Sequence, residues 1–394
     1  MLKNGELNLM NIPFIDLKTQ YARIEKQVRS NMDAVMEHGA YIMGPEIPAL
    51  EKRLAEYCGT KHGLGCASGT DALTLALMAL DVKPGDAVFT TPFTFFATAE
   101  AIALLGATPV YVDIDPVTFN IDPEKLEKTI EALKGAENGY PLPKVEGLTA
   151  KGIVTVGIFG LPADYDAIKT IADKHDLFII EDAAQSFGGE YKGRKSCSLG
   201  DITCTSFFPA KPLGCYGDGG MCFTDDDALI ERLRSHRVHG QGPDKYDNVR
   251  LGINGRLDTL QAAALQAKFD IFPEEVELRN KVASTYAELL GDIDGLTPPS
   301  TPEGDLSVWA QYCPLAKDGA HRDRIQAALK EKNVPSPVYY PIPLHLQTAF
   351  KELGYKMGDC PISEDAASRI FAIPMHPYLE REQQEYIADA IRNA

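Results

Sequence analysis

The chain has 394 residues, of which 44% are hydrophobic, enough to fill two packed cores and too many for a disordered protein. Its formal net charge of -17 argues against nucleic acid or an anionic membrane surface as a partner. The N-terminus, Met1 to Asn8, lacks the apolar core of a signal peptide, and no apolar run could span a membrane, so we expect a cytoplasmic protein. The eight cysteines lack paired zinc or redox spacing, which predicts reduced thiols and no metal site.

Helical spacing predicts a first helix at about 16–38 and a second at 45–57. Strand and helix patterns then alternate, with strands expected at 63–66, 87–91, 109–113, 153–159 and 177–182, and helices at 70–80, 94–105 and 165–175. This order predicts an α/β fold in which helices cover both faces of a mostly parallel sheet. The stretch at about 135–151 is rich in glycine and proline and predicts a surface loop.

The last third of the chain predicts a smaller second domain. A long helical pattern begins after Asp258 and leads into 274–290, and strand signals near 308–315 precede a proline-rich segment at 335–343. We therefore expect three parts. Residues 12–45 form an N-terminal lead and helix that pack on the small domain, residues 46–270 form a large domain that binds the cofactor, and residues 271–394 form a small α+β domain.

Lys211 is the strongest candidate for chemistry. Glycines and prolines crowd the run Ser206-Phe-Phe-Pro-Ala-Lys-Pro-Leu-Gly-Cys-Tyr-Gly-Asp-Gly-Gly220, so this lysine lies on a constrained turn rather than in a helix or plain strand. The apolar strand expected at 177–182 ends in Asp182, and ligands of open α/β sheets bind at the carboxyl ends of such strands. Both residues are therefore predicted to face one site. The alternative for Lys211 is a solvated surface charge.

A phosphate site is predicted where a strand leads into a helix, in the run Ala67-Ser-Gly-Thr-Asp-Ala72. There the amides of Gly69 and Thr70 can bind an anion at the helix N-terminus, or Ser68 and Thr70 simply cap the helix. A nicotinamide cofactor is a rival hypothesis, because Gly63-Leu-Gly65 followed by Gly69 resembles a loosened dinucleotide fingerprint. The spacing is off, however, and the following strand does not end in the acid that would hold a ribose.

Further polar and aromatic residues complete the set that pyridoxal 5'-phosphate requires. Ser206 can add a hydroxyl at the phosphate, Asn254 lies on a glycine-marked loop, and Gln185 follows Asp182 by three residues. The segment 91–98 contains Phe93, Phe95 and Phe96, which could all be core residues, or one of their rings can stack on a planar cofactor. A lysine forms the Schiff base, and an acid keeps the pyridine nitrogen protonated.

The same motifs resemble the DegT/StrS-type nucleotide-sugar aminotransferases, which are vitamin B6 enzymes of fold type I. The likeness extends over nearly the whole chain, through the runs Gly44-Pro-Glu, Ala67-Ser-Gly-Thr-Asp-Ala-Leu, Glu181-Asp-Ala-Ala-Gln-Ser, Asn254-Gly-Arg-Leu and His345-Leu-Gln. The resemblance implies a seven-stranded-type sheet between helices and a smaller C-terminal domain.

The resemblance also implies roles for individual residues. Lys211 is expected to carry the cofactor as a Schiff base and to shuttle the proton, and Asp182 to pair with the pyridinium nitrogen. The expected cofactor ligands are Gln185 at the ring hydroxyl, Phe95 as the stacking ring, and Gly69, Thr70 and Ser206 at the phosphate. In the family the asparagine that matches Asn254 reaches the phosphate of the neighbouring subunit, which implies a homodimer with shared active sites.

The residues after Lys211 indicate the substrate class. Pro-Leu-Gly-Cys-Tyr-Gly-Asp-Gly is similar to the branch that acts on 3-keto sugars, and the closest resemblance is to UDP-2-acetamido-2-deoxy-3-oxo-glucuronate aminotransferases of surface-polysaccharide (lipopolysaccharide, O-antigen) synthesis. The expected amino donor is L-glutamate. The alternatives are a 4-keto or another 3-keto nucleotide hexose. A sugar dehydratase of the same family would have histidine in place of Lys211, and a regulatory protein that binds the cofactor without turnover is the alternative of a different class.

The candidates for substrate contacts are few. Arg256, from the partner subunit, could bind the carboxylates of both glutamate and a hexuronate through its planar guanidinium, or it could only order an interface loop. His239 and His345 occupy motif positions near the active site in relatives, although a loop histidine is as often a structural hydrogen bonder. Ser186 and Tyr41 are weaker candidates.

Overall fold

The structure is a computed structural model that describes residues 10–136, 139–244 and 246–394. Residues 1–8, on which our expectation of a missing signal peptide was based, lie outside the described residues, as do 137–138 of the predicted loop. Within the described ranges, no helix is both long and apolar enough to cross a membrane. All eight cysteines are buried free thiols.

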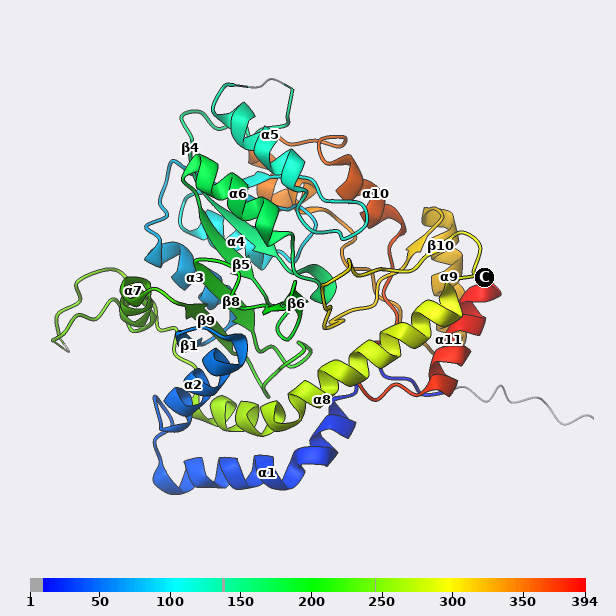
Figure 1. Cartoon of the computed structure of the whole chain (residues 1–394), viewed down its shortest axis with the longest axis horizontal. Coiled ribbons are helices and arrows are strands. Elements are labelled where there is room, and N and C mark those ends of the chain that lie inside the picture. The colour runs from blue at the N-terminus through cyan, green and yellow to red at the C-terminus, as the bar shows by residue number, and fades with distance from the viewer. Residues whose placement is uncertain (1–9, 137–138, 245) are drawn as a thin grey trace, which may run out of the picture.

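A seven-stranded sheet forms the centre of the molecule, in the order β1-β9-β8-β5-β4-β2-β3 (Figure 1). Its strands are β1 (His62–Cys66), β2 (Asp86–Thr90), β3 (Thr108–Tyr111), β4 (Thr149–Val156), β5 (Phe178–Asp182), β8 (Ile202–Ser206) and β9 (Gly220–Thr224). Neighbouring strands from β3 to β8 are parallel, whereas β9 runs antiparallel to both β8 and β1. The predicted mostly parallel sheet is confirmed.

Helices cover both faces of this sheet, as predicted. One face carries α3 (Gly69–Ala79), α4 (Ala97–Leu104) and α7 (Asp227–Arg237), which share a core with Val154 and Ile180 of the sheet. The alternate residues Ile153 and Ile179 face the other side and pack against α5 (Pro123–Leu133) and α6 (Tyr165–His175). Successive side chains of β4 and β5 point to opposite faces of the sheet, so each apolar run contributes to two separate cores.

Several sequence-based expectations differ from the structure. The helices α5 and α7 and the strands β8 and β9 were not predicted. The strand expected at 153–159 ends at Val156 and is followed by a 3-10 turn, Ile158–Gly160, in which Phe159 has a φ of 56°. The strand expected at 308–315 was wrong, because Trp309 has a φ of 51° and regular pairing begins only in β11 (Leu315–Ala316), beside β10 (Leu296–Thr297).

The N-terminal helices are where the sequence placed them. They are α1 (Leu17–His38), whose N-terminus is capped by Asp16, and α2 (Glu46–Cys58). The long helix α8 (Thr259–Leu290) lies beside α1 and connects the sheet region to the C-terminal region (Figure 1). The predicted domain boundary at 270 falls inside this helix.

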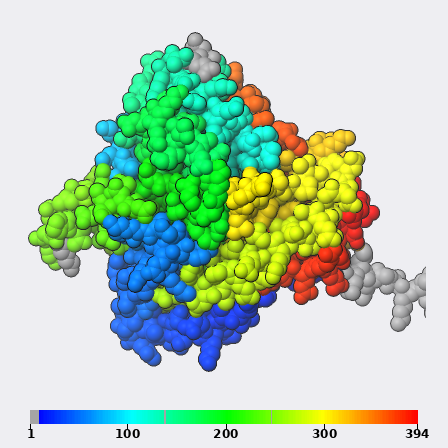
Figure 2. Space-filling model, viewed as in Figure 1, coloured from blue at the N-terminus to red at the C-terminus, as the bar shows by residue number. Residues whose placement is uncertain are grey.

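The C-terminal region has a core of its own, which includes Ile12 from the N-terminal lead. It is built from the second half of α8 with α9 (Gly319–Glu331) and α11 (Arg381–Arg392), and α10 (Pro361–Arg369) packs beside α9. Figure 2 shows these yellow to red segments gathered at one side of the molecule. The short elements that remain are β6 (Glu190–Tyr191), β7 (Arg194–Lys195), η2 (Leu344–Leu346) and η3 (Thr348–Leu353).

Candidate active site

A cavity of about 640 Å³ lies at the carboxyl ends of the sheet strands. Val156, Asp182 and Ser206, the last residues of β4, β5 and β8, all line it. Seven of the residues that the sequence predicted for a cofactor site are brought together in this lining, namely Gly69, Thr70, Phe95, Asp182, Gln185, Ser206 and Lys211. The rule that ligands bind at the carboxyl edge of an open sheet thus locates the cavity.

Lys211 lies on the loop between the antiparallel strands β8 and β9. The ends of this loop are held together, because Ser206 pairs with Gly220 in the ladder and the amide of Phe207 donates to the carbonyl of Gly219 at 2.7 Å. The turn itself is closed by the amide of Lys211, which donates to the carbonyl of Phe208 at 2.8 Å. The lysine is therefore presented from a closed loop with a fixed base.

Asp182 is a buried carboxylate with two hydrogen-bond donors. The hydroxyl of Thr98 donates to its Oδ2 at 2.8 Å, and the amide of Ala184 donates to its Oδ1 at 3.2 Å. Burial raises the pKa of Asp182, while these two donors and the positive charge of Lys211 oppose the rise. Burial likewise lowers the pKa of Lys211, and the carboxylate of Asp182 opposes that shift. Each group thus moderates the pKa of the other.

The start of α3 and the end of β8 form a narrow polar corner. Ser68 caps α3 by accepting a hydrogen bond from the amide of Asp71 at 3.0 Å, so Gly69 and Thr70 occupy its first turn. Ser206 lies directly beside Gly69, with its hydroxyl accepting from the amide of Phe208 at 3.2 Å. Unpaired amides at a helix N-terminus together with a neighbouring hydroxyl suit a phosphate group.

An aromatic ring with a free face stands in the cavity lining. Phe95 is 57% exposed, whereas Phe93 is fully buried in a core with Phe119 and Phe159. Tyr340 lies near both rings, at centroid distances of 6.5 Å from Phe95 and 6.3 Å from Phe93. Of the predicted stacking candidates, Phe95 therefore offers the cavity an open ring surface.

Gln185 is held from two sides. Its Oε1 accepts a hydrogen bond from the amide of Phe159 at 2.8 Å, and its Nε2 donates to the hydroxyl of Tyr340 at 3.0 Å. The second amide hydrogen of Nε2 remains for a ligand. The side chain thus links the turn after β5 to the C-terminal region.

The C-terminal region and the N-terminal lead supply a wall that sequence reasoning missed. It consists of Ile15, Gln311, Val338, Tyr339 and Tyr340. These residues come from three segments that are far apart along the chain, and none carries a local motif that marks a ligand site. Tertiary packing alone brings them to the cavity.

The other six predicted residues lie outside this lining. Ser186 is buried and its hydroxyl lies 2.7 Å from that of Ser196, while His345 is buried and bonds Glu364 at 3.0 Å. The remaining four lie at the surface. Arg256 is half-buried there, and Tyr41, His239 and Asn254 are exposed. A bridge between Ile42 and Asp258 brings the segments of Tyr41 and Arg256 together.

The residues of the cavity fit pyridoxal phosphate by their chemistry. A lysine amine with a lowered pKa, a buried carboxylate, a phosphate corner, an open aromatic ring and a free amide hydrogen surround one space. The corner is shaped for a close approach, because a β-carbon on Gly69 would lie 2.6 Å from the β-carbon of Ser206. The donor set and the cavity size thus match a phosphorylated planar aldehyde.

Comparison with known proteins identifies close relatives over the whole chain. It is 47% identical over 382 residues to the UDP-2-acetamido-2-deoxy-3-oxo-D-glucuronate aminotransferase of Pseudomonas aeruginosa, covering 97% of this chain and 100% of the relative. It is 44% identical over 384 residues to a pleiotropic regulatory protein of Geobacillus stearothermophilus, covering 97% and 98%. A crystal structure of an aminotransferase from Brucella abortus has a TM-score of 0.91 at 46% identity and covers 97% of this chain and 99% of that one.

These comparisons confirm the predicted fold, activity class and cofactor. A structure of ntda from Bacillus subtilis with bound cofactor pmp superposes with a TM-score of 0.86 at 28% identity, covering 99% of this chain and 86% of that one. The chain is a sugar aminotransferase of PLP fold type I that depends on pyridoxal phosphate. The family pattern matches residues 22–392, and the chain belongs to the DegT/DnrJ/EryC1/StrS aminotransferase family.

Proposed function

We propose that this enzyme transfers the amino group of L-glutamate to the 3-oxo group of UDP-2-acetamido-2-deoxy-3-oxo-glucuronate. The product would be a 3-amino sugar for surface polysaccharide such as the O-antigen of lipopolysaccharide, which would place the enzyme in the cytoplasm with other users of nucleotide sugars. The observation that carries the proposal is the 47% identity with the Pseudomonas enzyme over nearly the full length of both chains. The cavity with Lys211 beside Asp182 supports the same chemistry.

The residues of this chain divide the work between binding and proton transfer. Bound pyridoxal phosphate supplies an aldehyde that captures amines and a ring that accepts electrons. The carboxylate of Asp182 would hold a proton on the ring nitrogen, and the amine of Lys211, with its lowered pKa, would carry a proton from the amino-acid α-carbon to the cofactor. The reverse transfer aminates the keto sugar.

The remaining cavity residues fix the position of this proton transfer. The amides of Gly69 and Thr70 and the hydroxyl of Ser206 would bind the phosphate at the N-terminus of α3. Phe95 would stack on the ring, and Gln185 would donate its free amide hydrogen to the ring hydroxyl. A reacting atom held within a fraction of an ångström is what makes a single amine effective.

A homodimer supports this reaction better than one chain does. Both substrates carry carboxylates and the sugar adds a diphosphate, yet Lys211 is the only basic residue among the described residues that line the cavity. Asn254 and Arg256 of a second copy are our candidates for the missing donors, and His239 and Tyr41 lie on the same surface. Apolar side chains are exposed there, since Tyr41, Ile42 and Met43 are 48%, 54% and 43% exposed.

A panel assay tests the substrate. The pure protein is loaded with cofactor, mixed with glutamate until the aldehyde absorbance is lost, and then offered 3-keto and 4-keto nucleotide sugars. Recovery of the absorbance with the 3-oxo-glucuronate, and parallel double-reciprocal plots in the steady state, are the expected results. Recovery only with a 4-keto sugar would overturn the proposed acceptor and identify a 4-keto nucleotide sugar in its place.

The alternative of a different class is a protein that binds the cofactor without turnover, and one relative, from Geobacillus stearothermophilus, has a regulatory name. Such a protein would retain the aldehyde absorbance in the presence of glutamate. Loss of that absorbance on the timescale of seconds, with release of 2-oxoglutarate, separates the enzyme from the regulator.

A further inference from the structure

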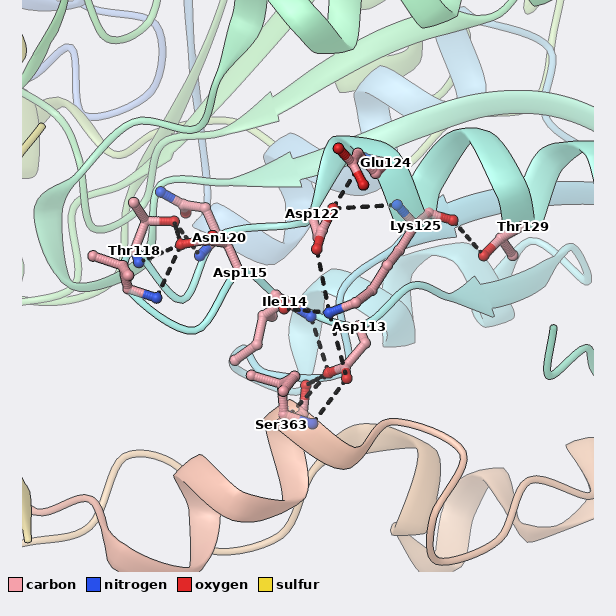
Figure 3. Close-up of polar contacts among 12 residues, drawn as sticks. Asp113, Ile114, Asp115, Thr118, Asn120, Asp122, Glu124, Lys125, Thr129 and Ser363 are labelled. Carbon is pink, nitrogen blue, oxygen red and sulfur yellow. Dashed lines mark hydrogen bonds and ion pairs between the residues drawn. The ribbon is translucent and has the colours of Figure 1, made fainter. Parts of the chain in front are cut away.

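The carboxylate of Asp113 connects the edge of the sheet to α10 (Figure 3). Its Oδ1 accepts from the amide of Ser363 at 2.9 Å and from the hydroxyl of Ser363 at 2.6 Å, and its Oδ2 accepts from the amide of Ile362 at 2.9 Å. Asp113 is buried and follows β3, whereas Ser363 is in the first turn of α10. The carboxylate therefore caps a helix that lies 250 residues further along the chain.

This contact replaces a cap that α10 lacks locally. Cys360 precedes the helix and makes no side-chain capping bond, and Pro361 at the start has no amide hydrogen to satisfy. The first free amides of α10 therefore receive their acceptor from another part of the molecule. A negative charge at this end also interacts favourably with the helix dipole.

The next residue of α10 extends the connection to His345. The Oε1 of Glu364 lies 3.0 Å from Nε2 of His345, and the two carboxylate oxygens accept from the amide of Gly358 at 2.8 and 2.9 Å. The side chain of His345 has no exposed surface, and its ring packs beside those of Tyr111 and Tyr355, at centroid distances of 6.4 and 6.3 Å. The imidazole is thus held by one hydrogen bond and by packing against two neighbouring rings.

His345 belongs to the segment that forms the aromatic wall of the cavity. The amide of Leu344 donates to the carbonyl of Pro92 at 2.8 Å, which anchors this segment beyond the end of β2. Tyr339 and Tyr340, a few residues earlier, line the cavity. Hydrogen bonds therefore connect Asp113 through α10 to His345, and the chain itself connects His345 to the two tyrosines.

We propose that Asp113 and His345 are positioning residues for Tyr339 and Tyr340, the tyrosine wall of the cavity. The hydrogen bonds from Asp113 through α10 to His345 form a polar bridge, and this bridge determines how tightly the enzyme binds the nucleotide-sugar acceptor. The proposal rests on the proposed function for the identity of that acceptor. The cofactor side of the cavity has an anchor of its own, because Gln185 also accepts a hydrogen bond from the amide of Phe159, which does not involve Tyr340. Loosening the bridge therefore weakens acceptor binding while the glutamate half-reaction proceeds.

The test compares three single variants of the holoenzyme. Asp113→Ala and His345→Leu each break the bridge, and His345→Gln is the conservative variant. Asp226→Ala is the matched control, because Asp226 caps α7 through two amides at 2.7 and 2.9 Å but contacts nothing near the wall. We expect hydrogen exchange at the Leu344 amide to accelerate about tenfold in the first two variants, and the KM of the acceptor to rise about tenfold. The rate of the glutamate half-reaction and kcat should stay within about twofold of the wild type. In His345→Gln the exchange rate and the acceptor KM should return close to the wild-type values.

Two outcomes overturn the inference. Unchanged exchange across residues 338–346 in both variants would show that the bridge does not hold the wall. Faster exchange with an unchanged acceptor KM would show that the wall does not set acceptor binding. If the wild type aminates no nucleotide sugar, the proposed function fails, and the exchange measurement still decides whether Asp113 and His345 position the tyrosines.

Discussion

Gly69 and Ser206 lie so close together that a β-carbon on the glycine would stand 2.6 Å from the β-carbon of the serine and 3.0 Å from its hydroxyl oxygen. The first turn of α3 and the last residue of β8 thus meet without room for an intervening side chain. This contact places a helix N-terminus and a hydroxyl on the same corner of the cavity. A cofactor phosphate bound there would be sensitive to any separation of the two elements.

Gly69→Ala should therefore weaken cofactor binding. The added methyl group forces α3 away from β8, and we expect the Kd of pyridoxal phosphate to rise at least tenfold. Gly319→Ala is the matched control, since Gly319 also begins a helix, α9, and its added β-carbon would meet only the carbonyl of Ser368 at 3.2 Å. Fluorescence titration of the cofactor-free proteins measures both. Equal affinities in the two variants would contradict the phosphate corner.

Lys211→Ala should abolish covalent attachment and turnover. The amine is both the attachment point and the proton carrier in our mechanism, so the glutamate half-reaction should slow by about a thousandfold or more. Borohydride reduction followed by peptide mass spectrometry should find the cofactor on the peptide of Lys211 in the wild type and nowhere in the variant. Lys268→Met tests whether any buried lysine suffices, because Lys268 is also buried. If Lys268→Met still carries the reduced cofactor on Lys211, Lys211 is confirmed as the attachment residue.

Asp182→Asn should lower the pKa of Lys211 further. Burial already lowers this pKa, and the negative charge of Asp182 opposes the shift, so its removal leaves burial unopposed. The pH dependence of amine acylation in the cofactor-free protein, followed by mass spectrometry, measures the change. Asp218→Asn removes the other acid of the cavity lining and should leave the Lys211 pKa near its wild-type value. A profile shifted equally in both variants would contradict a specific pair.

His376 should make stability depend on pH. It is 1% exposed, and burial lowers its pKa from 6.5 to about 4, with Asp16 opposing the shift and Arg279 adding to it. The unfolded state therefore binds the proton first, so the stability contribution is complete above pH 6.5 and is lost as pH falls toward 4. Between pH 7.5 and 5 the loss is about 2 kcal/mol.

The check for His376 is urea unfolding at these two pH values. The difference in unfolding free energy between the wild type and His376→Leu should shrink by that amount at pH 5, because the variant has no group to protonate there. A difference that is constant with pH would mean that the histidine is protonated equally in both states.

Arg256→Ala should lower the rates of both half-reactions if a second copy supplies the shared carboxylate ligand. Mixing this variant with Lys211→Ala should then restore activity, because a mixed dimer has one site with both residues intact. Wild-type rates in Arg256→Ala would end the shared-carboxylate hypothesis. Inactive mixed dimers would place the arginine in its own chain's site.

Local sequence patterns predicted the parts of the fold that rest on local physics. The apolar runs of β4 and β5 and the acid at the end of β5 were sufficient to predict the sheet and the site at its carboxyl edge. The strands β8, Ile-Thr-Cys-Thr-Ser, and β9, Gly-Met-Cys-Phe-Thr, are short and rich in threonine, cysteine and glycine, so neither gave an apolar run. Helix α5 did carry a signal, since Asp122 caps it and Pro123 begins it, and this signal was overlooked.

The site divides in the same way. Residues such as Gly69 and Asp182 lie at element ends with readable motifs, whereas Gln311 and Tyr340 reach the cavity only through packing of the C-terminal region. The roles assigned to the individual residues, and the three-part division of the chain, stay predictions. His345 shows why a motif position is insufficient, because its ring is buried against Glu364 rather than presented to the cavity.

The loop between β8 and β9 starts and finishes on one rung of the ladder, where Ser206 faces Gly220. The residues between them are not all interchangeable, because Phe207, Leu213 and Cys215 are buried in the core beneath the loop. Loops from relatives with other sugar preferences could be grafted between Ser206 and Gly220 if the graft retains the lysine and these three core positions. The exposed part of the loop can then vary while the position of the catalytic amine stays fixed.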